Sequence, residues 1–403
     1  MRSFGTAARA AVFSLGALAA AAATPAGAQV VKIGVVDTFS GPQASFGDYT
    51  DKGFRLYIKL HQKDLPPGVS IELINRDDGG PNPDRAKQLA QELVTRDQVN
   101  LLAGAAFTPI GIAVASVADE AKIPFVVTNA ASAVVTAKSQ YAVRFSFTVQ
   151  QSNVSLGSWA AKHYKTAYTL VSDYTPGWDT EQAFIKAFQA GGGTVLGSVR
   201  VPIQESDFTP YLQRVKDAKP NVLLVFVPGG RSSTVVMKSF ADLGLNKTTK
   251  LVGPGESILP DDELPNMGDA VLGAITVSHY SAAATRSANR AFVAAWKKEY
   301  GADTVPNFVG VAAWDGMDAI FQAIKAQNGK LDPDKTLDIL RHYASANSPR
   351  GPIAIDPATR DIVQNEYLRE VRKVDGRLEN VEIQTIATAV KADGTGGPVG
   401  TTP

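Results

Sequence analysis

Two hydroxyl side chains in this sequence follow two neighbouring hydrophobic segments, and their type and spacing suit the binding of an anion. Thr108 comes after the segment that ends at Leu102, and Ser132 comes after the segment Ile123–Val127. Hydroxyls and free backbone N–H groups at the start of a helix attract negative charge. The pair therefore predicts a site for a carboxylate, although either hydroxyl taken alone could simply cap a helix.

The elements around these hydroxyls are expected to bring them together. Thr108 and Pro109 start a helix, because threonine caps helices and proline is tolerated in the first turn. The uncharged run Ile123–Val127 is typical of a strand that is buried on both faces of a parallel sheet. Parallel strands end at one edge of their sheet, where open α/β proteins bind ligands. We therefore expect both hydroxyls at that edge.

The alternation of strand and helix continues from residue 30 onward and predicts an α/β fold with two lobes. Strands are expected over 32–37, 70–77, 99–102, 123–127 and 143–147 in one lobe, and over 168–172, 194–201, 221–226 and 250–253 in the other. Asp375-Gly376 between two alternating segments predicts a hairpin. The Gly-, Thr- and Pro-rich tail, 391–403, is expected to be disordered.

The first 28 residues predict a secretory signal peptide. Arg2 and Arg9 precede an alanine-rich apolar run, and small residues before Gln29 predict cleavage near Ala28. The sequence has no cysteine, which excludes disulfides and a lipid anchor on cysteine. We expect a soluble periplasmic protein. The net charge of +1 gives no reason to expect a nucleic-acid partner.

Motifs for catalysis are missing from the sequence. It contains no HExxH, no GxSxG, no phosphate-binding loop, and no glycine-rich dinucleotide loop after the first strand. The four histidines have no metal-ligand spacing, and His279, at a predicted strand end, is the one expected near a cleft. We therefore expect a binding protein with no metal and no cofactor. An acid–base enzyme needs only two carboxylates, so a secreted α/β hydrolase using Asp173 and Glu256 remains an alternative.

Four segments together resemble the periplasmic solute-binding proteins of ABC transporters, of the leucine/isoleucine/valine-binding type. They are KIGVVDTFSGPQASFGD, DDGGPNPDRA, the pair GAAFTP and IPFVVTNAAS, and LVGPGES. The resemblance covers nearly the whole chain after the signal peptide. It implies two Rossmann-like lobes with parallel-rich sheets, the type I periplasmic binding protein fold, joined by a three-strand hinge that closes on a solute. Applied to this sequence, it places lobe 1 at 29–148 plus 281–356 and lobe 2 at 149–280 plus 357–390.

The resemblance also implies which residues of the first lobe bind the ligand. Thr108 takes the place of a serine whose hydroxyl holds the ligand carboxylate. Ala130 and Ser132 match the alanine and threonine whose backbone and hydroxyl complete that cradle. Phe46 stands where the family often has an aromatic residue over the ligand, although a staple role for this side chain stays open.

The second lobe departs from the family pattern at two places. The family's ligand-binding tyrosine aligns with Gly177, and Tyr174 and Trp178 are the nearby candidates to replace it. The glutamate that pairs with the ligand ammonium follows a Gly-Pro directly, whereas here Glu256 comes one residue later. That carboxylate either pairs with an ammonium or merely begins a helix, where an acid suits the helix dipole.

These departures leave two ligand classes open. The part of the site that binds the carboxylate matches the family, whereas the part that binds the ammonium group departs from it. Our first expectation is a branched-chain amino acid, and an aromatic carboxylate is the alternative. Phe46, Phe107, Tyr174, Trp178 and Tyr280 would wall the cleft for a flat ring. We expect a monomer that delivers its solute to an ABC permease in the inner membrane. A soluble ligand-sensing module for a receptor is a further alternative.

Overall fold

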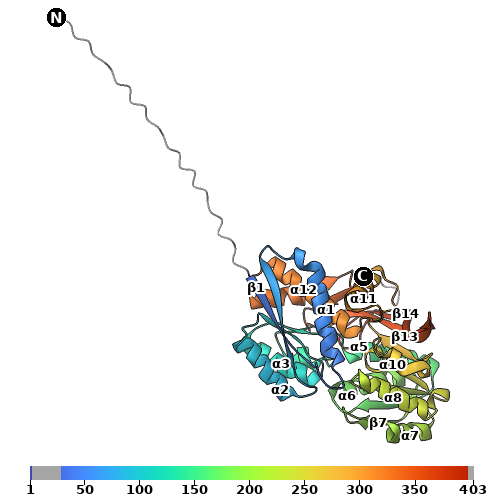
Figure 1. The fold of residues 1–403 in the computed structure, drawn as a ribbon. Coiled ribbons are helices and arrows are strands. Elements are labelled where there is room, and N and C mark those ends of the chain that lie inside the picture. Colours follow the sequence, from blue (N-terminus) through green and yellow to red (C-terminus); the bar gives the residue numbers. More distant parts are fainter. Residues whose placement is uncertain (2–28, 398–403) are drawn as a thin grey trace.

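Two β-sheets with helices packed against them form the part of the chain described by the computed structural model, residues 1 and 29–397 (Figure 1). Apart from Met1, the predicted signal peptide lies outside the described residues. The first sheet has the strand order β2-β1-β3-β4-β5, and every pair in it is parallel. Its strands are β1 (Gln29–Asp37), β2 (Val69–Asp77), β3 (Leu101–Gly104), β4 (Phe125–Val127) and β5 (Ala142–Arg144).

Helices cover both faces of the first sheet, and the side-chain alternation of β1 shows why. Val31, Ile33 and Val35 share one buried cluster with α1 and α12, whereas Val36 belongs to a cluster with α2 and α3 on the opposite face. The helices of this lobe are α1 (Ser45–His61), η1 (Gln62–Asp64), α2 (Pro83–Thr95), α3 (Thr108–Ala121), α4 (Val134–Lys138), α11 (Ser287–Tyr300), α12 (Phe308–Ala326) and α13 (Pro333–Arg341).

The second sheet has the order β11-β12-β13-β10-β9-β8-β6-β7, with β14 paired to β13. Its parallel strands are β6 (Thr166–Ser172), β7 (Thr194–Val201), β8 (Val222–Phe226), β9 (Lys250–Pro254) and β10 (Ile275–Ser278). Antiparallel pairs extend it through β11 (Ala344–Ser345), β12 (Ile353–Ile355), β13 (Ile362–Val374) and β14 (Arg377–Val390).

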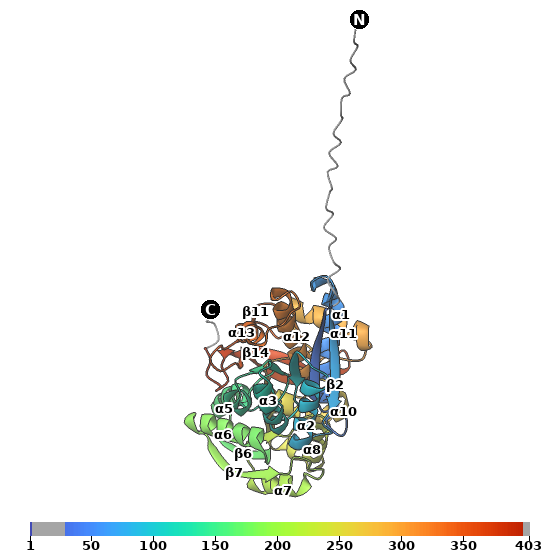
Figure 2. The same cartoon turned by 90° about the vertical axis from the view of Figure 1, so that its left-hand side faces the viewer.

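Helices of the second lobe include the pair α5 (Val149–His163) and α6 (Thr175–Ala190), which lie side by side (Figure 2). The others are α7 (Thr209–Ala218), α8 (Arg231–Asp242), η2 (Leu245–Lys247), α9 (Gly255–Ile258), α10 (Leu264–Met267) and η3 (Gly268–Val271). The chain leaves the first sheet after β5 for α5, passes from β10 to α11–α13, which pack with the first lobe, and rejoins the second sheet at β11. No helix among residues 29–397 is long and apolar enough to cross a membrane.

The C-terminal region shows one prediction confirmed and one corrected. Asp375 and Gly376 both have positive φ, 47° and 80°, and join β13 to β14 in the predicted hairpin. Residues 391–397, in contrast, are not disordered. The Thr148 hydroxyl donates to the Ala392 carbonyl oxygen at 2.6 Å, and Gly397 pairs with Thr388. Contacts with the start of α5 and with β14 hold this segment in place, and the composition of the tail does not predict them.

A buried carboxyl group lies at the end of β1. Asp37 is fully buried and accepts hydrogen bonds from the Thr50 hydroxyl at 2.8 Å and the Thr38 amide at 2.9 Å. Burial, helped by the charge of Asp78 and opposed by these hydrogen bonds, raises the pKa of Asp37 to about 7. The folded state therefore binds a proton at pH values where the unfolded chain has released it.

This pKa predicts a loss of stability as the pH rises. Between pH 3.8, the ordinary pKa of an aspartate, and about pH 7 the folded state holds a proton that the unfolded state lacks, so the free energy of unfolding falls across that window and then levels off. Asp37→Asn should flatten this part of the profile, as measured by urea unfolding from pH 4 to pH 8. The exposed variant Asp64→Asn is the control, and parallel profiles for wild type and Asp37→Asn would contradict the assignment.

Candidate functional site

A small cavity with a volume of about 30 Å³ lies where the two lobes meet. On the side of the first lobe, the cavity is lined by the loops after β3 and β4 and by the start of α12. Phe147, in the connection that follows β5, also lines it. The second lobe contributes the loops after β6, β8 and β9. The lining residues are Ala106, Phe107, Thr108, Asn129, Ala131, Phe147, Tyr174, Pro176, Phe226, Val227, Pro228, Pro254, Glu256, Ser257 and Phe308.

Thr108 lies at the wall formed by the first lobe, as the first residue of α3. Its side chain is buried, and its hydroxyl oxygen accepts a hydrogen bond from the Ser132 amide at 3.2 Å. Because that bond uses the oxygen as an acceptor, the hydroxyl proton stays available for an acceptor in the cavity. The sequence prediction that Thr108 and Ser132 meet at one sheet edge is therefore confirmed. Their role in binding a ligand stays a prediction.

The other members of the predicted carboxylate cradle are engaged elsewhere. The Ala130 amide donates to the Ala105 carbonyl oxygen at 2.8 Å, and it is Ala131 that lines the cavity. The Ser132 hydroxyl donates to the Asp179 carboxylate of α6 at 2.6 Å and so joins the two lobes. The Ala130 amide and the Ser132 hydroxyl were predicted to face the ligand, and both are bonded within the protein instead. The turn after β4 folds back on the loop after β3 and so uses the Ala130 amide.

Five aromatic side chains surround the cavity: Phe107, Phe147, Tyr174, Phe226 and Phe308. Phe107 and Tyr174 were predicted from the sequence. Phe147 and Phe226 each end a predicted strand, which was an available signal, whereas Phe308 begins a helix far away in the chain; all three were missed. Together the rings give the cavity apolar walls from both lobes.

Phe46, predicted as a ligand contact, packs behind this wall. Its ring makes edge contacts with Phe107 and Phe308, at centroid distances of 6.0 and 6.3 Å. An added Cβ at Gly229 of the second lobe would lie 3.3 Å from the Phe46 ring. Phe46 therefore supports the aromatic wall from the first lobe and reaches across to the second.

Two further candidates lie away from the cavity. Trp178 is 39% exposed, and its ring nitrogen donates to Asp173 at 2.7 Å. Tyr280 is fully buried in a separate apolar cluster with Phe292 and Trp296. The structure thus corrects their predicted placement: helix α6 turns Trp178 outward, and the chain leaves β10 in the direction of α11.

The local structure leaves no room for a side chain at Gly177, the position that the resemblance aligns with a family tyrosine. A Cβ built on Gly177 would lie 1.9 Å from the Ser172 carbonyl oxygen, so the start of α6 packs directly on the end of β6. No side chain fits there. Tyr174, three residues earlier, is buried and supplies the aromatic group to the cavity instead.

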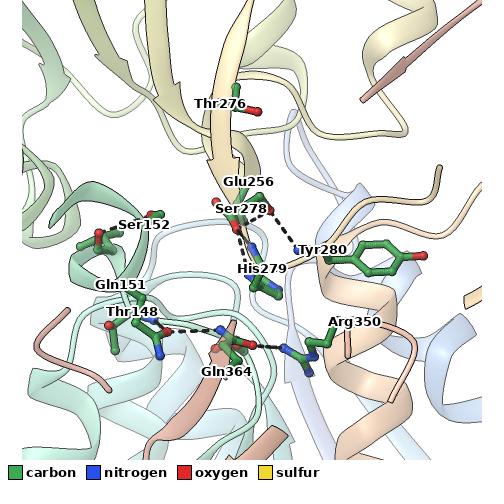
Figure 3. Close-up of polar contacts among 12 residues, drawn as sticks. Thr148, Gln151, Ser152, Glu256, Thr276, Ser278, His279, Tyr280, Arg350 and Gln364 are labelled. Carbon is green, nitrogen blue, oxygen red and sulfur yellow. Dashed lines mark hydrogen bonds and ion pairs between the residues drawn. The ribbon is translucent and has the colours of Figure 1, made fainter. Parts of the chain in front are cut away.

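Glu256 lines the cavity from the second lobe, 3% exposed, at the start of the short helix α9. One carboxylate oxygen, Oε1, accepts from the Ser278 hydroxyl at 2.6 Å and from the His279 amide at 3.3 Å, and His279 Nδ1 lies 2.8 Å away (Figure 3). The other oxygen, Oε2, has no hydrogen-bond partner among the described residues. Glu256 is therefore one of the residues that line the cavity, and its role in binding a ligand stays a prediction.

The charges behind Glu256 favour its ionised form. Burial raises the pKa of Glu256, but the hydrogen bond from His279 and the positive charge of Arg369 outweigh burial and hold the pKa below its usual value. Burial lowers the pKa of His279 to about 4, so this ring is neutral at pH 7. Glu366 on β13 is also buried; burial and the charge of Glu256 raise its pKa well above the ordinary range. The group therefore holds one ionised glutamate and one protonated glutamate.

No group of three or more potential metal ligands occurs within residues 29–397. The cavity also lacks a hydroxyl or thiol paired with a base in the geometry that nucleophilic catalysis needs: the Ser257 hydroxyl donates to the Val227 carbonyl oxygen at 2.6 Å. Asp173, the imagined acid–base partner of Glu256, is exposed and bonded to Trp178. The arrangement suits the enclosure of a small molecule.

Comparison with known proteins identifies the class. Residues 30–377 match the sequence model of the periplasmic binding proteins. The chain belongs to this family. It is 39% identical over 378 residues to the Leu/Ile/Val-binding protein homolog 6 of Brucella melitensis biotype 1, which covers 93% of this chain and 95% of the relative. The predicted family and two-lobed fold are thus confirmed.

Two solved structures are similar to this binding protein along most of its length. A solute-binding protein of an ABC transporter from Rhodopseudomonas palustris BisB5, in complex with 3,4-dihydroxybenzoic acid, is 45% identical. A solute-binding protein from R. palustris, in complex with 4-hydroxybenzoate, is 40% identical. Each has a TM-score of 0.85 and covers 90% of this chain and 98% of the solved chain.

Membership establishes the general function. This is a solute-binding protein of an ABC transporter, which binds a small molecule and works with a membrane permease. The family comprises binding proteins and is not an enzyme family, and it implies export to the periplasm.

The close approach at Gly177 predicts a stability defect. Gly177→Ala should lower the free energy of unfolding by about 1–3 kcal/mol, since the added methyl group must displace α6 from the end of β6. Urea unfolding measures the change. Gln182→Ala, at an exposed position of the same helix, is the control and should be neutral. A Gly177→Ala protein as stable as wild type would show that α6 has room to move.

Proposed function

We propose that this binding protein takes up a small aromatic carboxylate and delivers it to an ABC permease. The five aromatic rings around the cavity carry the proposal. Rings from both lobes provide flat apolar walls, and aromatic groups prefer to stack or meet edge to face on such surfaces. The two solved relatives, in complex with hydroxylated benzoic acids, support the same ligand class.

The ligand carboxylate is proposed to lie at the first lobe, against Thr108. The Thr108 hydroxyl is oriented by the Ser132 amide and keeps its proton for donation. Thr108 also begins α3, and the amino end of a fourteen-residue helix favours negative charge by about 0.3–1 kcal/mol. In this proposal Ser132 acts through Thr108 and through its bond to Asp179, and the backbone around Ala131 completes the cradle.

A branched-chain amino acid is the second candidate. It is supported by the relatives named Leu/Ile/Val-binding protein homolog 6 and by Glu256, an ionised carboxylate in the cavity wall that suits an ammonium group. Both ligands share the carboxylate end. They differ at the second lobe, where one brings a ring and the other an ammonium group with an aliphatic side chain.

A thermal-shift comparison should separate the two classes. We expect benzoate, 4-hydroxybenzoate or 3,4-dihydroxybenzoate to raise the melting temperature of the chain from Gln29 onward by several degrees, because these ligands bind only the folded state. Leucine, isoleucine and valine at the same concentration should leave it unchanged. A shift with leucine and none with any aromatic acid would replace the proposal by the second candidate.

Removing the Thr108 hydroxyl tests the carboxylate end. Thr108→Val keeps the shape but loses the proton donor, and should weaken benzoate and 4-hydroxybenzoate by about tenfold or more, as expected for one hydrogen bond to a charged group. Titration calorimetry measures the dissociation constants. Thr209→Val is a matched control, because Thr209-Pro210 begins α7 in the same way but is exposed. Equal affinities in all three proteins would remove Thr108 from the site.

A further inference from the structure

Two rings of the cavity wall come from distant parts of the chain and contact each other. Phe147 belongs to the connection after β5 and Phe308 begins α12, and their rings meet edge to face, with centroids 5.9 Å apart and an angle of 83° between the planes. Phe147 also stacks on His279 of the second lobe, at a centroid distance of 5.3 Å. Because both rings line the cavity, the position of the connection relative to α12 affects the shape of the cavity.

Arg350 holds the connection that carries Phe147. Its guanidinium group donates to the carbonyl oxygen of Phe145 at 2.7 Å and to that of Ser146 at 3.0 Å, and these two residues directly precede Phe147. Arg350 is 1% exposed and does not line the cavity. A planar guanidinium group carries several N–H donors in fixed directions, so it can hold two neighbouring carbonyl groups at once. The side chain therefore acts on the backbone of the connection and not on a solute.

The same guanidinium group is bound to α12. Its Nε donates to Asp315 Oδ2 at 2.8 Å, and the Ser348 hydroxyl donates to the same oxygen at 2.8 Å. Asp315 is buried and lies on α12 about two helical turns after Phe308. The ion pair is therefore a fixed point behind the cavity wall, and one arginine joins the segment of Phe147 to the helix of Phe308.

Strand β13 of the second sheet holds Arg350 itself. Gln364 accepts from Arg350 Nη1 at 2.9 Å (Figure 3), and its amide nitrogen donates to the Ser146 carbonyl oxygen at 3.2 Å. The Tyr367 hydroxyl donates to the Arg350 carbonyl oxygen at 2.8 Å, and a Cβ on Gly351 would lie 2.5 Å from that hydroxyl. Both ends of Arg350, the guanidinium group and the backbone, are therefore bonded to the second sheet.

We propose that Arg350 is a positioning residue for solute binding, which sets Phe147 against Phe308 in the cavity wall without touching the solute. It acts on Phe147 through the backbone of the connection and on Phe308 through Asp315. Contacts between packed atoms weaken steeply when a gap opens, so a small shift of one ring lowers the affinity for a solute that lies against it. The inference goes beyond the proposed function, because an aromatic acid and an amino acid would lie against the same wall.

Arg350→Lys tests this role, because lysine keeps a positive charge beside Asp315 but has no planar fork for the two carbonyl groups. Titration calorimetry should show the dissociation constant of 4-hydroxybenzoate raised by about fivefold or more, since the displaced rings lose packing contacts. The titration is made at a temperature where the variant is folded, and a lower melting temperature by itself does not change the affinity of the folded protein. The two measurements therefore separate positioning from stability.

A matched control and a second variant complete the test. Arg76→Lys removes the same kind of fork outside the cavity, where Arg76 binds Asp97 at 2.6 Å and the Asn75 carbonyl oxygen at 3.1 Å, and it should bind the solute like wild type. Arg350→Gln combined with Asp315→Asn leaves no unpaired buried charge and should weaken binding as Arg350→Lys does. A crystal structure of either Arg350 variant should show the rings of the cavity wall displaced from their edge contact.

The outcomes separate this inference from the proposed function. If Arg350→Lys binds 4-hydroxybenzoate as tightly as wild type, or if the Phe147 and Phe308 rings keep their edge contact in the variants, Arg350 has no positioning role and the aromatic ligand class stands. If 4-hydroxybenzoate does not bind to wild type, the proposed function falls. Leucine then replaces it as the probe, and the ring positions in the crystal structure still decide on the role of Arg350.

Discussion

Both sheets of this protein direct the carboxyl ends of their parallel strands toward the gap between the lobes, and the cavity depends on this constraint. At a buried sheet edge every turn leaves backbone N–H and C=O groups that need partners. The loops satisfy them with one another: the Ala130 amide bonds to Ala105 in the first lobe, and the Val227 amide bonds to the Ser257 hydroxyl in the second. Each wall of the cavity is therefore braced within its own lobe.

The lobes meet through apolar packing, in one buried cluster that joins Phe107 to Tyr174 and Phe226, and through hydrogen bonds. Three side-chain hydrogen bonds join the lobes around the cavity: Ser132 to Asp179, Gln43 to Ser232, and Asn307 to Asp262. Each such bond contributes about 0.5–1.5 kcal/mol. The Ser132 hydroxyl, predicted as part of the cradle, thus belongs to the contact between the lobes.

Buried charge is the second constraint on the cavity. An ionised carboxylate inside a protein is tolerated when a cation and hydrogen bonds offset the lost hydration. The charge of Glu256 is offset by Arg369 and by hydrogen bonds from Ser278 and His279. Glu366 is uncharged, because its raised pKa keeps it protonated. All of these groups lie on or beside the strands that connect the lobes. The electrostatics of the cavity and the geometry of the hinge region are therefore set by the same segments.

The sequence by itself determined the α/β class, the hairpin at Asp375-Gly376 and the meeting of Thr108 with Ser132, because side-chain periodicity and helix starts are local and parallel strands share one edge. Only the tertiary structure decided which side chains reach the cavity. Phe308 enters it from a distant helix, Trp178 turns outward, and the Ser132 hydroxyl bonds across the lobes. These outcomes depend on how the two sheets are placed relative to one another, which no local pattern of residues encodes.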